Sequence, residues 1–266
     1  RQIGVVVTGQ TADLAPMDKA IYALRDVTGT VSSIPLIASS IMSKKIAAGA
    51  DKILIDIKVG DGALLQNKSD ANKLSDLMKK IGKFYNREVR TIISDMNVPL
   101  GHAIGNSIEV MEAIKVLKGE EVNNNLVDLC IELATEMVSM GKNIDRTVAY
   151  DEVVDSIKSG KAYNKFLELV KAQGGKIDSL RLSDDSIEII ATEAGVVRKI
   201  DALELGKLSV KLGAGRVSKE DKIDYNVGIY LNKLVGDTVK KGDLLATVYV
   251  NKNIKLDEFD DIFVIK

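Results

Sequence analysis

Residues 53–57 read Ile-Leu-Ile-Asp-Ile and residues 89–93 read Val-Arg-Thr-Ile-Ile, and these two β-rich runs decide the fold. Runs of β-branched residues bounded by turn residues predict strands. Between them, the turn Gly60-Asp61-Gly62 leads to Ser69, which can cap a helix that runs to about Tyr85. A strand, a helix and a second strand at this spacing need a crossover connection, so the sequence predicts a parallel sheet covered by helices.

The segment before this unit predicts one strand and two helices. The apolar run Ile3–Val7 is typical of a strand that is buried on both faces. Because a protein rarely begins inside its core, and because this chain opens without methionine, we interpret it as part of a longer chain. Pro16, followed by acidic Asp18, predicts a helix to about residue 26, and a second helix is expected from Pro35 to Ala48.

The pattern changes in the second half of the chain. Residues 106–174 predict almost continuous helix, whereas short β-rich runs punctuated by glycine begin near residue 190. These runs are Gly195–Ile200, Leu208–Leu212, Val227–Leu231, Leu244–Val250 and Ile262–Ile265. The predicted fold class is therefore α/β: a parallel or mixed sheet flanked by helices, with a small helical segment and a C-terminal α+β barrel-like domain.

These patterns divide the chain into three parts. We expect residues 1–13 and 50–188 to form a central α/β domain whose N-terminal part is missing, residues 14–49 a helical segment, and residues 189–266 a C-terminal α+β domain. The stretch Val235–Ala246 resembles half of a biotinyl- or lipoyl-type carrier module. The tripeptide around the modified lysine of such carriers is absent, so we interpret the match as shared architecture.

Composition excludes several classes of function. The chain has 266 residues, 45% hydrophobic and 28% charged, which is typical of a globular protein. A net charge of −1 gives no electrostatic reason to expect nucleic acid or a membrane as partner, and we expect a cytoplasmic protein. The single histidine, His102, excludes a multi-histidine metal site, and the single cysteine, Cys130, lies in an apolar run that predicts a buried, inert thiol.

The predicted helix at residues 35–48 carries an unusual lysine. At 100° per residue one stripe of the helix is apolar and contains Ile34, Ile37, Ile41 and Ala48. Lys44 falls inside this stripe, and Ser40 lies beside it one turn earlier. A buried ammonium is costly unless it is paired, so either Lys44 faces a pocket or its charged end reaches water.

The segment Tyr22–Lys45 resembles the signature region of thymidine and pyrimidine-nucleoside phosphorylases, and the similarity extends over essentially the whole chain. Other matching stretches are Gly9-Gln10-Thr11, Leu14-Ala15-Pro16, Asp56–Ala63, Ser94–Asn97 and Gly213–Arg216. Members of that family use inorganic phosphate, and no organic cofactor, to split pyrimidine nucleosides such as uridine, thymidine and deoxyuridine. The products are the free base and (deoxy)ribose 1-phosphate, so the resemblance implies a pentosyltransferase of nucleoside salvage.

The resemblance also implies roles for individual residues. Arg25, Ser40 and Lys44 are the expected base-contacting residues, with Tyr22 and Ile37 as walls of the pocket. Negative charge builds on the departing base, so fixed cations and donors aimed at its nitrogens and carbonyl oxygens lower the barrier. The family's phosphate-binding segment lies upstream of this sequence, so we expect the chain by itself to contact the base without phosphorolysis.

A monovalent-cation site and a homodimer are implied in the same way. The expected cation ligands are the carbonyls of Leu100 and Ala103 and the carboxylate of Glu112, an all-oxygen set that suits potassium. The alternative is that Glu112 is a solvated helix residue. Two other functions stay open: an anthranilate-type phosphoribosyltransferase, against which residues 190–266 argue, and a non-catalytic biotinyl- or lipoyl-like module.

Overall fold

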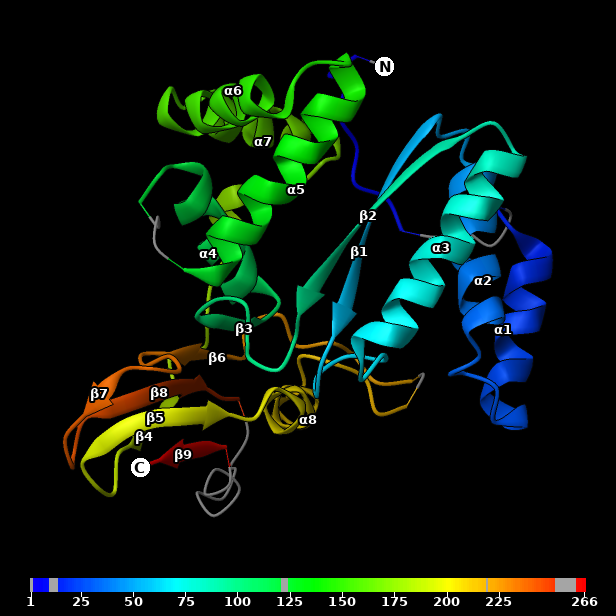
Figure 1. Cartoon of the computed structure of the whole chain (residues 1–266). Helices are drawn as coiled ribbons and strands as arrows, with labels where there is room; N and C mark the ends of the chain where they lie inside the picture. Colours follow the sequence, from blue (N-terminus) through cyan, green and yellow to red (C-terminus); the bar gives the residue numbers. More distant parts are fainter. Residues whose placement is uncertain (1, 10–13, 121–123, 219, 252–261) are drawn as a thin grey trace. The chain divides into compact units, whose positions relative to one another are not determined.

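The computed structural model describes residues 2–9, 14–120, 124–218, 220–251 and 262–266 (Figure 1). The chain separates into two compact units. The first comprises residues 1–95 and 131–153, and the second comprises residues 96–130 and 154–266. The three-part division expected from the sequence stays a prediction.

A parallel pair of strands is the centre of the first unit. Strand β1 (Lys52–Val59) pairs with β2 (Glu88–Asp95) in a register that runs from Lys52 opposite Glu88 to Val59 opposite Asp95. Helix α3 (Lys68–Phe84) forms the crossover, which confirms the predicted strand, helix and strand. The helix begins two residues earlier than expected, because the Asn67 side chain accepts the Asp70 amide N–H at 2.9 Å and so caps it in place of Ser69.

Apolar side chains hold α2 (Ile34–Ala47) and α3 against one face of this sheet. The buried members of this core are Ile37, Ala38, Met42, Ile53, Ile57, Val59, Leu65, Ala71, Leu74 and Met78. Ala38 and Met42 lie one turn apart on α2, and both are fully buried. Helix α1 (Pro16–Thr28) contacts α2 and ends at Gly29, whose φ of 66° suits glycine at a helix C-terminus.

Ion pairs connect the first unit's strands to its remaining helical segments. Arg90 on β2 donates to Glu136 of α5 (Asn125–Lys142) at 2.8 Å. Arg146, the first residue of α6 (Arg146–Lys158), donates to the other oxygen of the same carboxylate at 3.0 Å. Glu136 therefore joins the consecutive helices α5 and α6 to a strand residue 46 positions away in sequence.

The predicted strand at Ile3–Val7 is wrong. These residues form no regular structure, and Val6 and Val7 are 67% and 69% exposed. A strand exists only when its backbone N–H and C=O groups find a neighbour, and in the described part of the chain β1 and β2 pair only with each other. The residue types at positions 3–7 favour a strand, but they do not determine whether a neighbouring strand is present to pair with it.

Two antiparallel sheets form the second unit. One has the order β3 (Ala103–Gly105), β6 (Gly228–Leu231), β8 (Leu244–Tyr249) and β4 (Ser186–Ile190), and the other has the order β7 (Thr238–Val239), β5 (Gly195–Ile200) and β9 (Phe263–Ile265). Among the described residues these sheets do not close into a barrel. Together with the parallel pair in the first unit, they confirm the predicted α/β class with both parallel and antiparallel strands.

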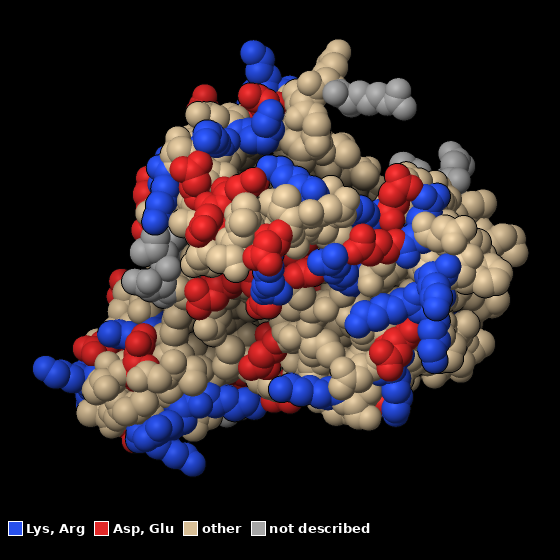
Figure 2. Space-filling model, turned by 45° about the horizontal axis from the view of Figure 1, so that its top comes forward, with Lys and Arg blue, Asp and Glu red and all other residues tan. Residues whose placement is uncertain are grey.

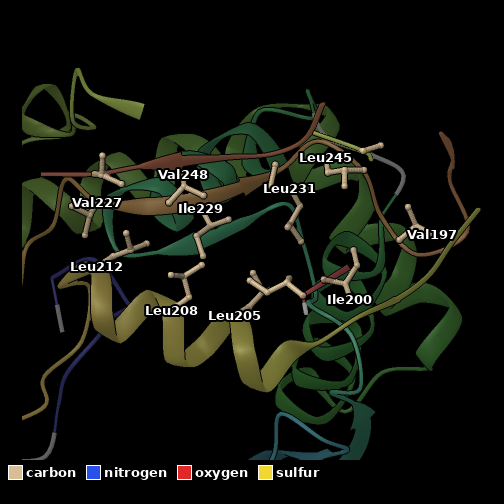
Figure 3. Close-up of a cluster of buried hydrophobic side chains, with 14 of the residues drawn as sticks. Val197, Ile200, Leu205, Leu208, Leu212, Val227, Ile229, Leu231, Leu245 and Val248 are labelled. Atoms are coloured by element: carbon tan, nitrogen blue, oxygen red, sulfur yellow. The ribbon is translucent and has the colours of Figure 1, made fainter. Parts of the chain in front are cut away.

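The predicted strand at Leu208–Leu212 is also wrong, because these residues end helix α8 (Ala202–Leu212). The Asp201 carboxylate caps the helix by accepting the amides of Leu203 and Glu204 at 3.1 Å each. The alternation Leu-Ser-Val-Lys-Leu suggested a strand, but Leu205, Leu208 and Leu212 have helical spacing. Figure 3 shows them pointing from α8 toward strand residues such as Ile229, Leu231 and Val248, with which they form one core.

The long helical region expected at residues 106–174 is confirmed as α4 (Ser107–Leu117), α5, α6 and α7 (Lys161–Ala172), and a short turn, η1 (Ile177–Ser179), follows. The buried thiol expected at Cys130 is wrong, because Cys130 lies on the exposed side of α5 although Val127, one turn earlier, is buried. None of the helices in the described ranges is long and apolar enough to cross a membrane. On the face drawn in Figure 2, acidic and basic side chains are intermixed.

Candidate functional site

Helices α1 and α2 bring the predicted base-contacting residues together. Asp18, Tyr22 and Arg25 lie at positions i, i+4 and i+7 of α1 and therefore share one face of that helix. Ser40 and Lys44 are one turn apart on α2. The two helices contact each other, so these five residues, which we call the α1–α2 cluster, meet although as many as 26 positions separate them in sequence.

Lys44 is the centre of the α1–α2 cluster. Its Nζ lies 2.9 Å from Oδ2 of Asp18 and 2.8 Å from Oγ of Ser40. The Asp18 side chain is 8% exposed and that of Lys44 is 22% exposed, so the pair is largely removed from water. The ammonium therefore has a carboxylate partner, which offsets the cost of placing a charge in this part of the helix.

The environment of Asp18 keeps it ionised. Burial by itself would raise the pKa of the Asp18 carboxyl. Hydrogen bonds from Lys44 and Ser40, together with the positive charges of Lys44 and Arg25, act in the opposite direction, and the net pKa lies below the ordinary aspartate value. Asp18 is therefore a carboxylate at neutral pH and accepts hydrogen bonds without donating any.

Arg25 is buried with hydrogen-bonding capacity to spare. One of its terminal N–H groups donates to the carbonyl of Val31, while its Nε is buried and has no hydrogen-bond partner in the described part of the chain. A guanidinium has five N–H donors in a planar fork, and it suits planar acceptors such as carbonyl oxygens. A buried donor without a partner is costly, so this arrangement favours a ligand that completes it.

Tyr22 links the two cations. The guanidinium carbon of Arg25 lies 5.2 Å from the centroid of the Tyr22 ring, and Nζ of Lys44 lies 5.9 Å from it. Both distances allow attraction between a cation and an aromatic face. The two cations therefore gather around one half-exposed aromatic ring.

The sequence-based interpretation missed Asp18 as a site residue, because it assigned Asp18 only to the start of a helix. The spacing of Asp18, Tyr22 and Arg25 was the signal that could have identified it. A carboxylate on the same helix face as an arginine is a natural partner for a lysine on the neighbouring helix.

The predicted cation ligands lie in the second unit. Glu112 on α4 is 4% exposed, so the alternative of a solvated helix residue is wrong. Its carboxylate accepts the amide N–H of His102 at 2.7 Å and that of Ala103 at 3.2 Å, one on each oxygen. Gly101 is part of the same contact, because a Cβ at that position would lie 2.5 Å from Oε2 of Glu112.

The Glu112 carboxylate keeps acceptor capacity that a cation could use. Each carboxylate oxygen that accepts one N–H retains further lone-pair capacity. In the described ranges, no three His, Cys, Asp or Glu residues converge to hold a metal ion, so a cation at Glu112 would depend mostly on carbonyl oxygens. The set Leu100, Ala103 and Glu112 stays a prediction.

A polar cluster also lies at the carboxyl end of the parallel strands. Oγ of Ser94 donates to Oδ1 of Asp56 at 2.5 Å, and Lys58 donates to Ser94 at 2.9 Å and pairs with Asp56. In the loop that follows β1, the Gly60 amide donates to the carbonyl of Leu65 at 3.0 Å, so this amide is engaged within the loop. An anion cradle built from the amides of this loop would therefore lack one of its donors.

A hollow of about 1070 Å³ in the second unit contains none of the predicted residues. It lies beside the start of α4, where burial raises the pKa of Glu109, the nearby Glu112 charge acts in the same direction, and the Gly105 amide acts against it. The other charged groups on its walls are Asp178, Arg181 and Asp224. The α1–α2 cluster, and not this hollow, carries the chemistry that the sequence predicts.

Comparison with known proteins identifies two regions of the chain. Residues 1–163 match the family described as "Glycosyl transferase family, a/b domain". Residues 196–262 match the "Pyrimidine nucleoside phosphorylase C-terminal domain". Together these two regions cover most of the chain, on both sides of residues 164–195.

Curated relatives that share one name with each other are similar to this chain over almost its whole length. The pyrimidine-nucleoside phosphorylase of Bacillus subtilis (strain 168) is 50% identical over 257 residues, which is 93% of this chain and 59% of the relative. That of Staphylococcus epidermidis (strain ATCC 12228) is 47% identical over 268 residues, 97% of this chain and 60% of the relative. The chain thus spans about 60% of the length of these relatives.

The resemblance inferred from Tyr22–Lys45 is confirmed by these matches. The family match covers more than half of the chain, and the C-terminal match is to a domain of the same kind of enzyme. The chain belongs to the glycosyl transferase family defined by this α/β domain, and it is related throughout to the pyrimidine-nucleoside phosphorylases.

Proposed function

We propose that this protein is the base-binding part of a pyrimidine-nucleoside phosphorylase. The reaction would convert uridine, thymidine or deoxyuridine and inorganic phosphate into the free base and (deoxy)ribose 1-phosphate. The observation that carries this proposal is the α1–α2 cluster, in which Arg25, Ser40 and Lys44 converge with unused hydrogen-bonding capacity. The names and similarity of the relatives support the same reaction.

The chemistry of the cluster suits the leaving group. Phosphate oxygen forms a bond to C1′ of the sugar while the bond from C1′ to N1 of the base breaks. The electron pair of that bond moves to the base, where the negative charge spreads over the ring nitrogens and carbonyl oxygens. Lys44 and Arg25 would stabilise this charge more strongly than the neutral ground state, which is the requirement for catalysis.

The alternatives fit less well. Residues 196–262 match the C-terminal domain of pyrimidine nucleoside phosphorylases, a part that we do not expect in an anthranilate-type phosphoribosyltransferase. The same match contains Val235–Ala246, which supports shared architecture and not a biotinyl or lipoyl carrier. We place the phosphate co-substrate outside the α1–α2 cluster, because no part of the cluster forms an amide-lined anion cradle.

We extend the proposal to potassium binding at Leu100, Ala103 and Glu112 and to a cytoplasmic homodimer. The support for potassium is that Glu112 is buried and held against the loop that would supply the carbonyls. The support for a dimer is an exposed apolar stripe on α1 with helical spacing. Its members, which are 44–79% exposed, are Met17, Ile21, Leu24 and Val27.

Direct binding of the base tests the central proposal. Uracil and thymine should bind the wild-type chain in an NMR titration, and Arg25→Ala and Lys44→Ala should each weaken binding by about tenfold or more, as expected for a lost charged hydrogen bond. Lys45→Ala is the matched control, because Lys45 is the next residue of α2 and is exposed. Unchanged affinity in both folded variants would refute the assignment.

A further inference from the structure

The hollow beside the start of α4, which we call the α4 hollow, lies within the second unit and has an acidic lining. Its volume of about 1070 Å³ is large enough for an organic molecule. Carboxylates reach it from three separate places: Glu109 on α4, Asp178 in η1 and Asp224 in the loop before β6. Arg181 is the only cation on its walls among the described residues, so negative charge is in excess.

The three carboxylates have no cationic partner. In the described part of the chain, none of them forms an ion pair, either with Arg181 or with any other cation. Glu109 accepts the Gly105 amide at 2.9 Å with one oxygen, and its other oxygen is unused. Partial burial raises the pKa of Glu109, and the Glu112 charge acts in the same direction. A positive charge beside Glu109 would therefore be favourable.

The hydroxyl of Ser107 is a second unfilled group in the α4 hollow. Ser107 is the first residue of α4, lines the hollow and is only 7% exposed. Its backbone N–H donates to the carbonyl of Tyr225 at 3.3 Å, but its hydroxyl has no hydrogen-bond partner among the described residues. A buried hydroxyl without a partner is costly, so this group favours a ligand that hydrogen-bonds to it.

Apolar side chains separate the charged groups of the walls. They are Val110, Leu180 and Ile223, and each lies within two positions of one of the carboxylates in sequence. Removing such side chains from water stabilises a complex when the ligand presents apolar surface to them. A ligand that fills the hollow well therefore has apolar parts between its charges.

The spread of the carboxylates disfavours a metal ion as the occupant. A divalent metal ion needs several ligand atoms around one point. Among the described residues, no three His, Cys, Asp or Glu side chains converge in this way. A point cation could therefore neutralise one carboxylate at a time, whereas an extended cation with several ammonium groups could reach more than one.

We propose that the α4 hollow binds a linear polyamine, whose ammonium groups pair with Glu109, Asp178 and Asp224 and whose methylene chain packs against the apolar walls. One ammonium also donates to the hydroxyl of Ser107, which can accept through its lone pairs. The site is independent of the α1–α2 cluster, because the two belong to different compact units.

The test is an NMR titration of the isotope-labelled chain with spermidine at constant ionic strength. Shifts should concentrate at the amides of Gly105, Ser107 and Tyr225, which line the hollow. Glu109→Gln should weaken binding by about tenfold, the loss expected when a charged hydrogen bond is removed. Asp178→Asn should weaken it by roughly threefold, because Asp178 is exposed and exposed ion pairs contribute less.

Glu204→Gln is the matched control. Glu204 is the third residue of α8, as Glu109 is the third residue of α4, but it does not line the hollow and it pairs with Lys207 at 2.7 Å. This variant removes the same charge from the same unit and should keep the wild-type affinity. Magnesium chloride is the control for a point cation, and at equal concentration of charge it should not displace spermidine.

The outcomes decide between a built site and a general attraction of charge. Equal affinity of Glu109→Gln and Glu204→Gln, with shifts spread over the surface, would overturn the site. Displacement of spermidine by magnesium, or no binding to the folded wild-type chain, would overturn it as well. Circular dichroism reports folding, and Glu109→Gln keeps an acceptor for the Gly105 amide. If that variant does not fold, Asp178→Asn decides: unchanged affinity would overturn the proposal, and a loss would support it.

Discussion

The α1–α2 cluster and the loop at residues 100–103 that Glu112 holds, which we call the Glu112 loop, both contain charges that are largely removed from water. The charges of the two regions have opposite sign. The cluster contains two cations, Arg25 and Lys44, against one carboxylate, Asp18, and its unused capacity consists mainly of donors. The Glu112 loop contains a buried carboxylate that is satisfied by backbone N–H groups, and its unused capacity consists of acceptors. The first suits a ligand that becomes negative, and the second suits a cation.

The comparison teaches how to separate a ligand site from a structural contact. A buried charge whose donors or acceptors are all used stabilises the fold, whereas one with unused capacity favours a ligand. Arg25 is of the second kind, because its buried Nε lacks a partner in the described chain. Glu112 combines both, because it anchors the loop and keeps lone pairs.

The largest expected effect comes from removing the cations of the α1–α2 cluster. When the upstream phosphate-binding part accompanies this chain, Lys44→Ala and Arg25→Ala should each reduce kcat/KM for phosphorolysis of uridine by roughly 100- to 1,000-fold, the usual loss when one donor to a developing anion is removed. The measurement is phosphate-dependent release of uracil, and Lys45→Ala serves as the exposed neighbour on the same helix. Turnover equal to wild type in both variants would contradict a base-contacting role.

The next effect comes from disturbing the packing of the loop against Glu112. Gly101→Ala would place a Cβ 2.5 Å from Oε2 of Glu112, so the loop or α4 must shift. We expect a loss of about 1–3 kcal/mol in the free energy of unfolding, the usual cost of overpacking. Denaturant unfolding measures it, with Gly206→Ala as control, because that glycine lies in α8 with nothing within 4 Å of an added Cβ. Equal stability of the two variants would show that the loop yields freely.

A smaller effect tests whether Glu112 and the loop that it holds bind potassium. At a potassium concentration of ten times Kd, binding to the folded state should add about 1.4 kcal/mol of stability. Thermal unfolding in potassium chloride and in tetramethylammonium chloride at equal ionic strength measures this difference. Glu112→Gln should abolish it, because the neutral amide is a weaker ligand. An equal shift with both salts in the wild-type chain would count against the site.

The smallest effect is the pH dependence of the stability that Asp18 contributes in the α1–α2 cluster. The pKa of Asp18 is lower in the folded chain than the ordinary value of about 3.9, since Lys44, Ser40 and Arg25 outweigh burial. Its stabilising contribution is therefore complete above that ordinary value and is lost as the pH falls through the folded pKa. Asp18→Asn should cost about 1 kcal/mol or less at neutral pH, because the Lys44 ammonium is 22% exposed and keeps its contacts with water and with Ser40.

The difference between wild type and Asp18→Asn in denaturant unfolding should therefore shrink as the pH is lowered from 5 toward the folded pKa of Asp18. Asp70→Asn is the control, because Asp70 also has a lowered pKa but lies in an exposed pair. A constant difference across this range would mean that the ionisation of Asp18 contributes nothing to stability.

Local patterns were sufficient for much of the fold and the site. The parallel strands around residues 53–57 and 89–93, the crossover helix and the helical region from residue 106 follow from hydrophobic periodicity and turn residues, which act over a few positions. Arg25, Ser40 and Lys44 follow from one continuous segment, as does the helical spacing that places Ser40 beside Lys44. Family membership follows from the same residues.

Only the tertiary structure decided which of these residues have partners. It pairs Lys44 with Asp18, 26 positions away, and it turns Leu208–Leu212 into the end of a helix that supplies one wall of a core. It also leaves Ile3–Val7 without a neighbouring strand in the described chain and exposes Cys130. The physical reason is common to all four cases: hydrogen bonds, ion pairs and burial are relations between distant segments, and a residue's own neighbours in sequence do not determine them.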